Sequence, residues 1–282
     1  MGRFATSWAI TKASLRIVRE DKELLVLPVL SAVAGFVLLA AVVGVGWTQG
    51  LFPTVTDAQG HVNPLSLLLL AVLYLGLAFV NVFFGAAVVA GATERMAGGN
   101  PTLGSCLRAA ARRSGRLLAW AAITATVSIL LQVLRERGGL AGRITAGLGS
   151  LAWGLATYFA LPVRLFEDVA VGAAIGRSGS LFKKTWGESV IGTSGVGLVF
   201  GIATAAVVLV GMFAIQAVRG TPGSLVTLVA IGLAMLTAIV LLLAFQSVLS
   251  GVYKSALYRY ATTGQLPAGF APEHIANAFV PR

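Results

Sequence analysis

Two adjacent carboxylates, Glu167 and Asp168, stand in the stretch LPVRLFEDV, which covers residues 161–169. A pair of carboxylates can perform general acid–base catalysis, and together with Arg164 the pair could instead hold an ion. Neighbouring residues on a helix point about 100° apart, so the two carboxylates do not converge on one substrate. The stretch also follows a long apolar run. We therefore interpret it as the point where a helix leaves a membrane.

The other residues of this stretch fit a membrane boundary. Pro162 can kink the last helical turn and direct the chain along the interface. Arg164 can extend its guanidinium to the lipid headgroups, and the two acids would ionise just outside the hydrocarbon. A sharper alternative is a polar cluster of Arg164, Glu167 and Glu188 that locks or gates the cytoplasmic face. The sequence leaves both interpretations open.

The composition identifies the solvent around these residues. Hydrophobic residues make up 57% of the 282-residue chain and charged residues 11%, with a mean hydropathy of +0.88. Soluble domains carry roughly 25% charged residues, so lipid must surround much of this chain. Apolar runs near the ~20 residues that cross a bilayer predict six helices. These predicted spans cover residues 24–47, 65–91, 117–134, 144–166, 190–217 and 225–250.

The distribution of Lys and Arg predicts how these spans are oriented. Cytoplasmic loops of membrane proteins carry an excess of basic residues. Of the 21 Lys and Arg residues, all but four fall on the side that includes both termini. We therefore expect both termini to lie in the cytoplasm, on the inner side of a plasma membrane. The exceptions are Arg219 and the arginines of a basic outer loop at residues 135–143, whose role stays open.

A weak threefold pattern runs along the chain. A basic, partly amphipathic segment precedes each pair of spans, and a shorter echo relates residues 92–101 to residues 256–267. The pattern predicts an all-α integral membrane protein with six transmembrane helices, arranged as three hairpins that each follow a basic amphipathic cytoplasmic helix. The predicted domains are an N-terminal amphipathic cytoplasmic segment (1–23), a six-helix transmembrane domain (24–250) and a cytoplasmic C-terminal tail (251–282).

The second basic segment carries three arginines, Arg108, Arg112 and Arg116, each four residues after the last. On one continuous helix they share a face, which predicts contact with anionic lipid headgroups. Thr102 is a suitable residue for the start of this helix. The lone cysteine, Cys106, is expected to be a small packing residue.

Polar residues inside the predicted spans are costly in lipid and therefore face protein or water. Asn81, Thr124, Ser128 and Gln246 are such residues, and they either join helices or line a pore. No Asp, Glu, Lys or Arg lies in the middle of a span, which argues against a carrier that uses buried carboxylates. The fifth span has a ladder of small residues that predicts close packing against another helix or subunit. The ladder consists of Gly197, Gly201 and Ala205.

Motifs of common catalytic sites are absent from the sequence. It contains no HExxH, G-x-S-x-G or Walker A pattern, and its single cysteine cannot form an intramolecular disulfide or a cysteine metal cluster. We therefore expect no enzymatic activity, no metal and no cofactor. The net charge of +11 is distributed between apolar runs without a basic domain. The expected partners are thus anionic lipid headgroups rather than nucleic acid.

The stretch between Pro162 and Glu188 resembles a family of uncharacterised prokaryotic membrane proteins with six spans. Their pattern has the form P…E…A-[IL]-x-x-S…W, which matches Pro162, Glu167, Ala174, Ile175, Ser178 and Trp186. The stretch DKELLVLPVLSAVA is also similar to their first span. The family is related to the membrane domain attached to some glycerophosphodiesterases. The resemblance implies the six-helix fold but not that activity.

Two functions from different classes are compatible with the sequence. The favoured one is an oligomeric pore or transporter for an ion or small solute, lined by the polar residues of the spans. The alternative is a non-conducting scaffold that binds anionic lipid or another membrane protein through a basic cytoplasmic face. The pore requires a homo-oligomer with a continuous hydrated path. The scaffold requires a dry core and exposed arginines.

Overall fold

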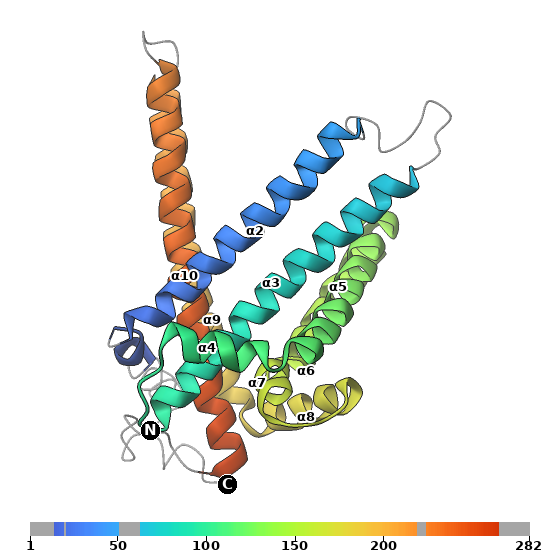
Figure 1. Cartoon of the computed structure of the whole chain (residues 1–282), viewed down its shortest axis with the longest axis vertical. Helices are drawn as coiled ribbons and strands as arrows, with labels where there is room; N and C mark the ends of the chain where they lie inside the picture. Colours follow the sequence, from blue (N-terminus) through green and yellow to red (C-terminus); the bar gives the residue numbers. More distant parts are fainter. Residues whose placement is uncertain (1–13, 20, 51–62, 219–223, 265–282) are drawn as a thin grey trace. The chain divides into compact units, whose positions relative to one another are not determined.

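The regular structure described by the computed structural model is helical, and no strand occurs among the described residues. These are residues 14–19, 21–50, 63–218 and 224–264, and the side chains of 186–194 and 224 lie outside the description. Residues 14–19 form a short helix ahead of the labelled ones. Figure 1 shows α2 (Lys22–Thr48), α3 (Pro64–Met96), α4 (Leu103–Ala111), α5 (Ser114–Arg137), α6 (Gly139–Ala156), α7 (Ala160–Phe166), α8 (Val171–Lys184), α9 (Trp186–Val218) and α10 (Ser224–Thr263).

Six helical segments in the described part of the chain are long and apolar enough to cross a membrane, as predicted. They are α2, α3, α5, α6 together with α7, α9 and α10. Large apolar side chains such as Phe36, Leu130 and Phe213 are 70%, 62% and 75% exposed on them. A soluble protein would cover such side chains, because burying each one contributes about 1.5–3 kcal/mol. The chain is therefore a multipass α-helical membrane protein.

A short helix precedes each pair of spanning helices, which confirms the predicted order of three hairpins. The short helices are residues 14–19, α4 and α8. In α8, Ala174 and Ser178 are buried one turn apart, as expected for a helix that lies with one face against other elements. In α4 the buried residues are Cys106 and Ala110, and Cys106 thus packs as predicted.

Contacts divide the chain into two compact units, each described here by itself. The boundaries fall inside α2 and α3, whereas the sequence predicts one domain over residues 24–250. Unit 1 contains Met1–Val29, Gly91–Pro101 and Lys184–Arg282, and unit 2 contains Leu30–Ala90 and Thr102–Lys183.

Helix α10 extends beyond the predicted sixth span. The span was predicted to end at residue 250, but the helix continues to Thr263. Val252, Tyr253 and Leu257 are buried in this last part, so it has a packed face although the sequence there is more polar. Residues 265–282 of the predicted tail lie outside the described residues.

The hairpin of α9 and α10 in unit 1 packs through aromatic and small residues. The rings of Phe200 and Phe245 stack with centroids 5.7 Å apart. Gly211 lies so close to Met235 that an added Cβ would be 2.5 Å from the methionine sulfur. The two helices therefore approach closely at Gly211, where α9 has no side chain.

An ion pair fixes the end of α3 in unit 1. The Nε atom of Arg95, in the last turn of α3, lies 2.7 Å from a carboxylate oxygen of Asp21. Asp21 stands between the helix of residues 14–19 and α2, and it is only 6% exposed. A buried carboxylate needs such a partner because burial otherwise disfavours its charge. The pair joins the chain before α2 to the end of α3.

The hairpin of α5 and α6 is tightly packed within unit 2. At one end Trp120 stacks on Trp153 with ring centroids 6.1 Å apart. At the other end, a Cβ added to Gly138 would be 2.5 Å from the Cα of Gly142. Gly139 between them has a φ of 58°, a conformation that glycine adopts without strain. These glycines let the two backbones approach at the turn.

Candidate functional site

The candidate site of unit 2 is built around a break between α6 and α8. Helix α6 ends at Ala156, and residues 157–159 separate it from α7. Pro162 stands in the first turn of α7, where the N–H that proline lacks would have no helical partner. In a continuous helix the proline ring would clash with the carbonyl group four residues earlier. The kink predicted in the last turn is therefore wrong in position, because the helix breaks before the proline.

Helix α8 is held against this break by a hydrogen bond and an aromatic contact. The N–H of Phe159 donates to the hydroxyl oxygen of Ser178 at 2.9 Å, and both residues are fully buried. The rings of Tyr158 and Phe182 meet edge-on with centroids 5.4 Å apart. A backbone N–H at the break thus receives a partner from α8, as buried backbone groups require. The serine of the sequence pattern has a structural role here.

Arg164 is the central polar residue of the site. It is 4% exposed, and its guanidinium donates to the Val169 carbonyl at 2.7 Å and to the Arg116 carbonyl at 3.0 Å. It therefore links α7 to the segment before α8 and to the first turn of α5. The predicted extension of Arg164 to lipid headgroups is wrong, because protein carbonyls accept its hydrogen bonds.

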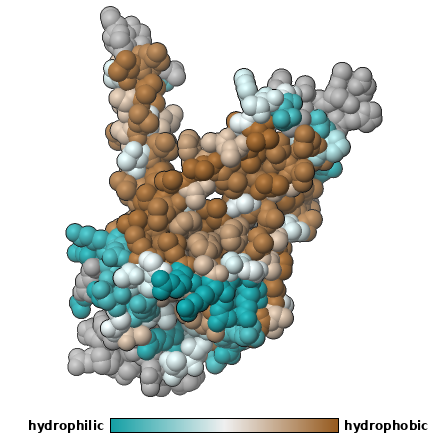
Figure 2. Space-filling view, viewed as in Figure 1, coloured by the Kyte–Doolittle hydropathy of each residue, from teal (hydrophilic) through white to brown (hydrophobic). Residues whose placement is uncertain are grey.

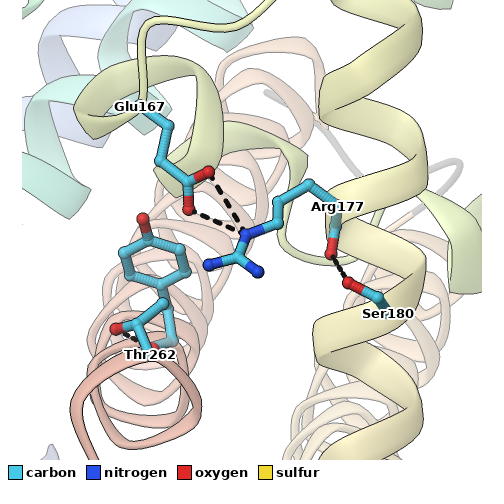
Figure 3. Close-up of polar contacts among 5 residues, drawn as sticks. Glu167, Arg177, Ser180 and Thr262 are labelled. Carbon is cyan, nitrogen blue, oxygen red and sulfur yellow. Dashed lines mark hydrogen bonds and ion pairs between the residues drawn. The ribbon is translucent and has the colours of Figure 1, made fainter.

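The two adjacent carboxylates bind different arginines. Both carboxylate oxygens of Glu167 lie 3.3 Å from Nε of Arg177 on α8, as Figure 3 shows. Asp168 forms an ion pair with Arg116. The two acids therefore anchor α8 and α5 to the segment between α7 and α8, and the geometry gives no sign of a shared catalytic role.

Only two members of the predicted polar cluster of Arg164, Glu167 and Glu188 have described side chains. Arg164 donates to backbone carbonyls and not to Glu167. The partner of Glu167 on α8 is Arg177, which the sequence interpretation missed although it stands only ten residues later. The side chain of Glu188 lies outside the described residues.

Helix α4 presents two of the three predicted headgroup arginines at the surface. Its start is capped by Thr102, whose hydroxyl accepts from the Ser105 N–H at 3.1 Å while its own N–H donates to the Ser105 hydroxyl at 3.0 Å. Arg108 and Arg112 are exposed, and neither forms an ion pair with a described residue.

The third arginine, Arg116, does not share their helix face. Helix α4 ends at Ala111 and α5 begins at Ser114, so the continuous helix that would align the three arginines is interrupted. Arg116 is held on α5 by Asp168, and its carbonyl binds Arg164. Tertiary contacts have therefore overridden the local spacing, and the prediction of one shared face is wrong.

A further cation, Lys183, is exposed near the end of α8, whose opposite face is buried. We call Arg108 of α4, Arg112 at the C-terminal cap of α4 and Lys183 of α8 the basic face of unit 2. Figure 2 shows hydrophilic residues at the end of the unit where α4 and α8 lie, beside the hydrophobic surface of the spanning helices. Such a border is typical of the interface between lipid headgroups and hydrocarbon.

The four polar residues predicted to line a pore or join helices have separate surroundings. Asn81 is exposed on α3, and Ser128 is exposed on α5. Thr124 donates its hydroxyl to two carbonyls of its own helix at 3.0 Å each, which satisfies it without water. Gln246 is half-buried on α10. No hydrogen bond joins any two of the four in the part of the chain that the structure describes.

The small-residue ladder of α9 does not pack closely within unit 1. A Cβ added to Gly197 or Gly201 would meet nothing within 4 Å, and Ala205 is exposed. Within unit 1 the two glycines therefore do not pack closely against α10, and packing against another helix stays a prediction. Packing against a second subunit stays a prediction.

A cleft between α5 and α6 was not foreseen from the sequence. Polar residues spaced by three or four positions along α5 were the available signal, because they share one helix face. The cleft has a volume of about 260 Å³ and is lined by Ser128, Leu131, Gln132, Arg135, Ser150, Trp153 and Gly154. Among the described residues, no group of three or more His, Cys, Asp or Glu side chains could hold a metal ion.

Comparison with known families shows that the chain belongs to the family of unknown function DUF6159, which matches residues 65–270. The match includes the break, α8 and five of the six spans, whereas the first span, α2, lies before the matched residues. No curated protein matches the chain, and no solved structure does. The expected membership of a family of unknown function is thus confirmed. The relation to the glycerophosphodiesterase-associated domain and the prokaryotic origin stay predictions.

Proposed function

We propose that this multipass membrane protein is a non-conducting scaffold that binds anionic lipid headgroups through its basic face. The observation that carries the proposal is the exposure of Arg108 on α4 and of Arg112 at its C-terminal cap, while Cys106 and Ala110 of the same helix are buried. Because no described carboxylate pairs with them, their charges are available to lipid phosphates. No enzymatic step and no cofactor are part of the proposal.

The order of the helices supports one common side for this face. Two membrane crossings, α5 and the α6–α7 segment, separate α4 from α8, so both short helices lie on the same side of a bilayer. We place this side, together with both termini, in the cytoplasm, because basic residues accumulate there. The membrane in this proposal is a prokaryotic plasma membrane.

The expected strength of the interaction follows from the number of cations. A basic residue near an anionic membrane surface contributes about 1 kcal/mol. Arg108, Arg112 and Lys183 together then contribute about 3 kcal/mol, or roughly a hundredfold preference for anionic over neutral headgroups. An effect of this size is measurable as selective lipid retention.

The test compares two charge reversals in the full chain. Arg108→Glu with Arg112→Glu removes the basic face of α4, and Arg137→Glu with Arg143→Glu changes the same charge at exposed positions in or near the turn of the α5–α6 hairpin. Native mass spectrometry measures retention of phosphatidylglycerol against phosphatidylcholine in mixed micelles. We expect at least a ~10-fold loss of preference for the first pair only. Equal losses in both pairs would contradict the proposal.

An oligomeric pore or transporter is the second candidate, and one observation favours it. The ladder face of α9 is open within the described chain at Gly197 and Gly201, so an identical subunit could pack there. Mass photometry in nanodiscs measures the subunit number, and solute flux into liposomes measures conduction. A ring of subunits with flux above protein-free liposomes would favour the pore, whereas a monomer without flux supports the scaffold.

A further inference from the structure

The cleft between α5 and α6 is not part of the basic face, and small residues set its shape. On its α6 wall, Ser150 and Gly154 are small residues one turn apart. At Gly149 the helices meet closely, since an added Cβ would be 2.9 Å from Leu131 Cδ2, whereas a Cβ added to Gly154 would meet nothing within 4 Å. The cleft therefore exists because small residues on α6 face larger ones on α5.

The α5 wall of the cleft is rich in hydrogen-bond donors. Ser128, Gln132 and Arg135 line it, and their spacing places them along one helix face. Arg135 has five N–H donors and no acceptor. The amide nitrogen of Gln132 bonds to Glu136 and keeps a second N–H, while the hydroxyl of Ser150 is already bonded to a carbonyl of its own helix. The lining thus fits an anion better than a cation.

The charge and the size of the cleft restrict its occupant further. Arg135 is the one charged residue in the lining, and it is exposed. Pockets for drug-sized ligands have volumes of roughly 300–1,000 Å³, and this cleft has about 260 Å³. It can hold a phosphate-bearing headgroup but not a whole lipid.

We infer that the cleft binds the headgroup of one anionic phospholipid, on the membrane side opposite the basic face. Helix α5 has 24 residues and is therefore about 36 Å long, which places Arg135 in its last turn a full bilayer away from α4. The acyl chains lie along apolar side chains exposed on the same two helices, such as Leu130 and Leu151. Trp153 supplies an aromatic wall at the end of the cleft farther from the hairpin turn, where it stacks on Trp120.

The experiment uses the full chain carrying Arg108→Glu and Arg112→Glu, so that lipid held by the basic face is removed first. Arg135→Gln removes the charge of the cleft, and Gly154→Leu fills the cleft without a change of charge. Arg137→Gln is the matched control, because it removes an exposed charge outside the lining. Native mass spectrometry of a phosphatidylglycerol titration measures the affinity, and thermal unfolding shows that each variant is folded.

We expect about tenfold weaker phosphatidylglycerol binding for Arg135→Gln and for Gly154→Leu, and less than a twofold change for Arg137→Gln. Unchanged binding in both cleft variants, or an equal loss in the control, overturns the inference. If phosphatidylcholine binds as strongly as phosphatidylglycerol, the inference of an anionic headgroup is wrong. If inorganic phosphate at the same concentration displaces phosphatidylglycerol, the cleft is a site for the free anion and not for the lipid. This test is independent of the proposed function. If the basic face does not bind lipid, the result for the cleft is unchanged, because Arg108 and Arg112 are already replaced in the chain used.

Discussion

Arg164 is the residue whose loss is expected to destabilise unit 2 most. Arg164→Ala removes two charged hydrogen-bond donors, to Val169 at 2.7 Å and to Arg116 at 3.0 Å. A hydrogen bond to a charged group contributes about 1.5–3 kcal/mol. The Arg116 carbonyl keeps its helical partner four residues later, so its loss is smaller than that of Val169.

One cost of the buried guanidinium reduces the expected effect. Its Nε atom is buried without a hydrogen-bond partner among the described residues, and removal of the side chain also removes that penalty. The free energy of unfolding should therefore fall by about 2–4 kcal/mol rather than by the full sum of two charged bonds.

Denaturant unfolding of the full chain in detergent micelles, followed by circular dichroism, measures this change. Arg177→Ala is the matched control, because its Nε contacts one carboxylate, that of Glu167, with both oxygens at 3.3 Å, and its side chain is 45% exposed. Such exposed ion pairs contribute at most about 1 kcal/mol. Arg164→Lys should lie between the two, since one ammonium replaces a fork that reaches two carbonyls. Equal destabilisation by Arg164→Ala and Arg177→Ala would refute this reasoning.

Three further experiments test the packing within each of the two units. Ser178→Ala removes the acceptor of a buried backbone N–H, and we expect a loss of about 1–3 kcal/mol and faster proteolysis between α6 and α8. Asp21→Ala should lower the free energy of unfolding by about 1–3 kcal/mol. Adding Arg95→Ala should lower it little further, because the two substitutions remove the same ion pair, and a double-mutant cycle measures this coupling. Gly211→Leu should lower the unfolding temperature, since Met235 leaves no room, whereas Gly201→Leu should leave a monomer unchanged; equal shifts would show that the close contact is unimportant.

The six spans could be predicted from the sequence because a bilayer imposes a long apolar run on each helix. Their ends could not, because packing sets them. Helix α10 continues to Thr263 on a buried face that includes Val252 and Leu257. The fourth span breaks before Pro162, and the broken backbone is completed by Ser178 from α8. A hydropathy pattern contains no information about that partner.

The candidate site was predicted less well for a related reason. An arginine at the end of a span commonly reaches the headgroups, but the carbonyl that binds Arg164 belongs to a residue 48 positions earlier. The same contacts hold Arg116 on α5 and interrupt the helix face predicted for the three arginines. The exposure of Arg108 and Arg112, in contrast, followed from local helix periodicity, because no distant residue competes for them.

Two of the three hairpins behind the weak repeat of the sequence share a contact at the end of the returning helix. Arg95 ends α3 and Arg164 ends α7, and each binds the chain at the start of the first helix of its own hairpin. Their partners differ, since one is the carboxylate of Asp21 and the other the backbone carbonyl of Arg116. An arginine suits both, because its donors bind carboxylates and carbonyls alike and its charge favours a helix C-terminus. A repeat that retains this geometry without retaining the partner residue is necessarily faint in the sequence.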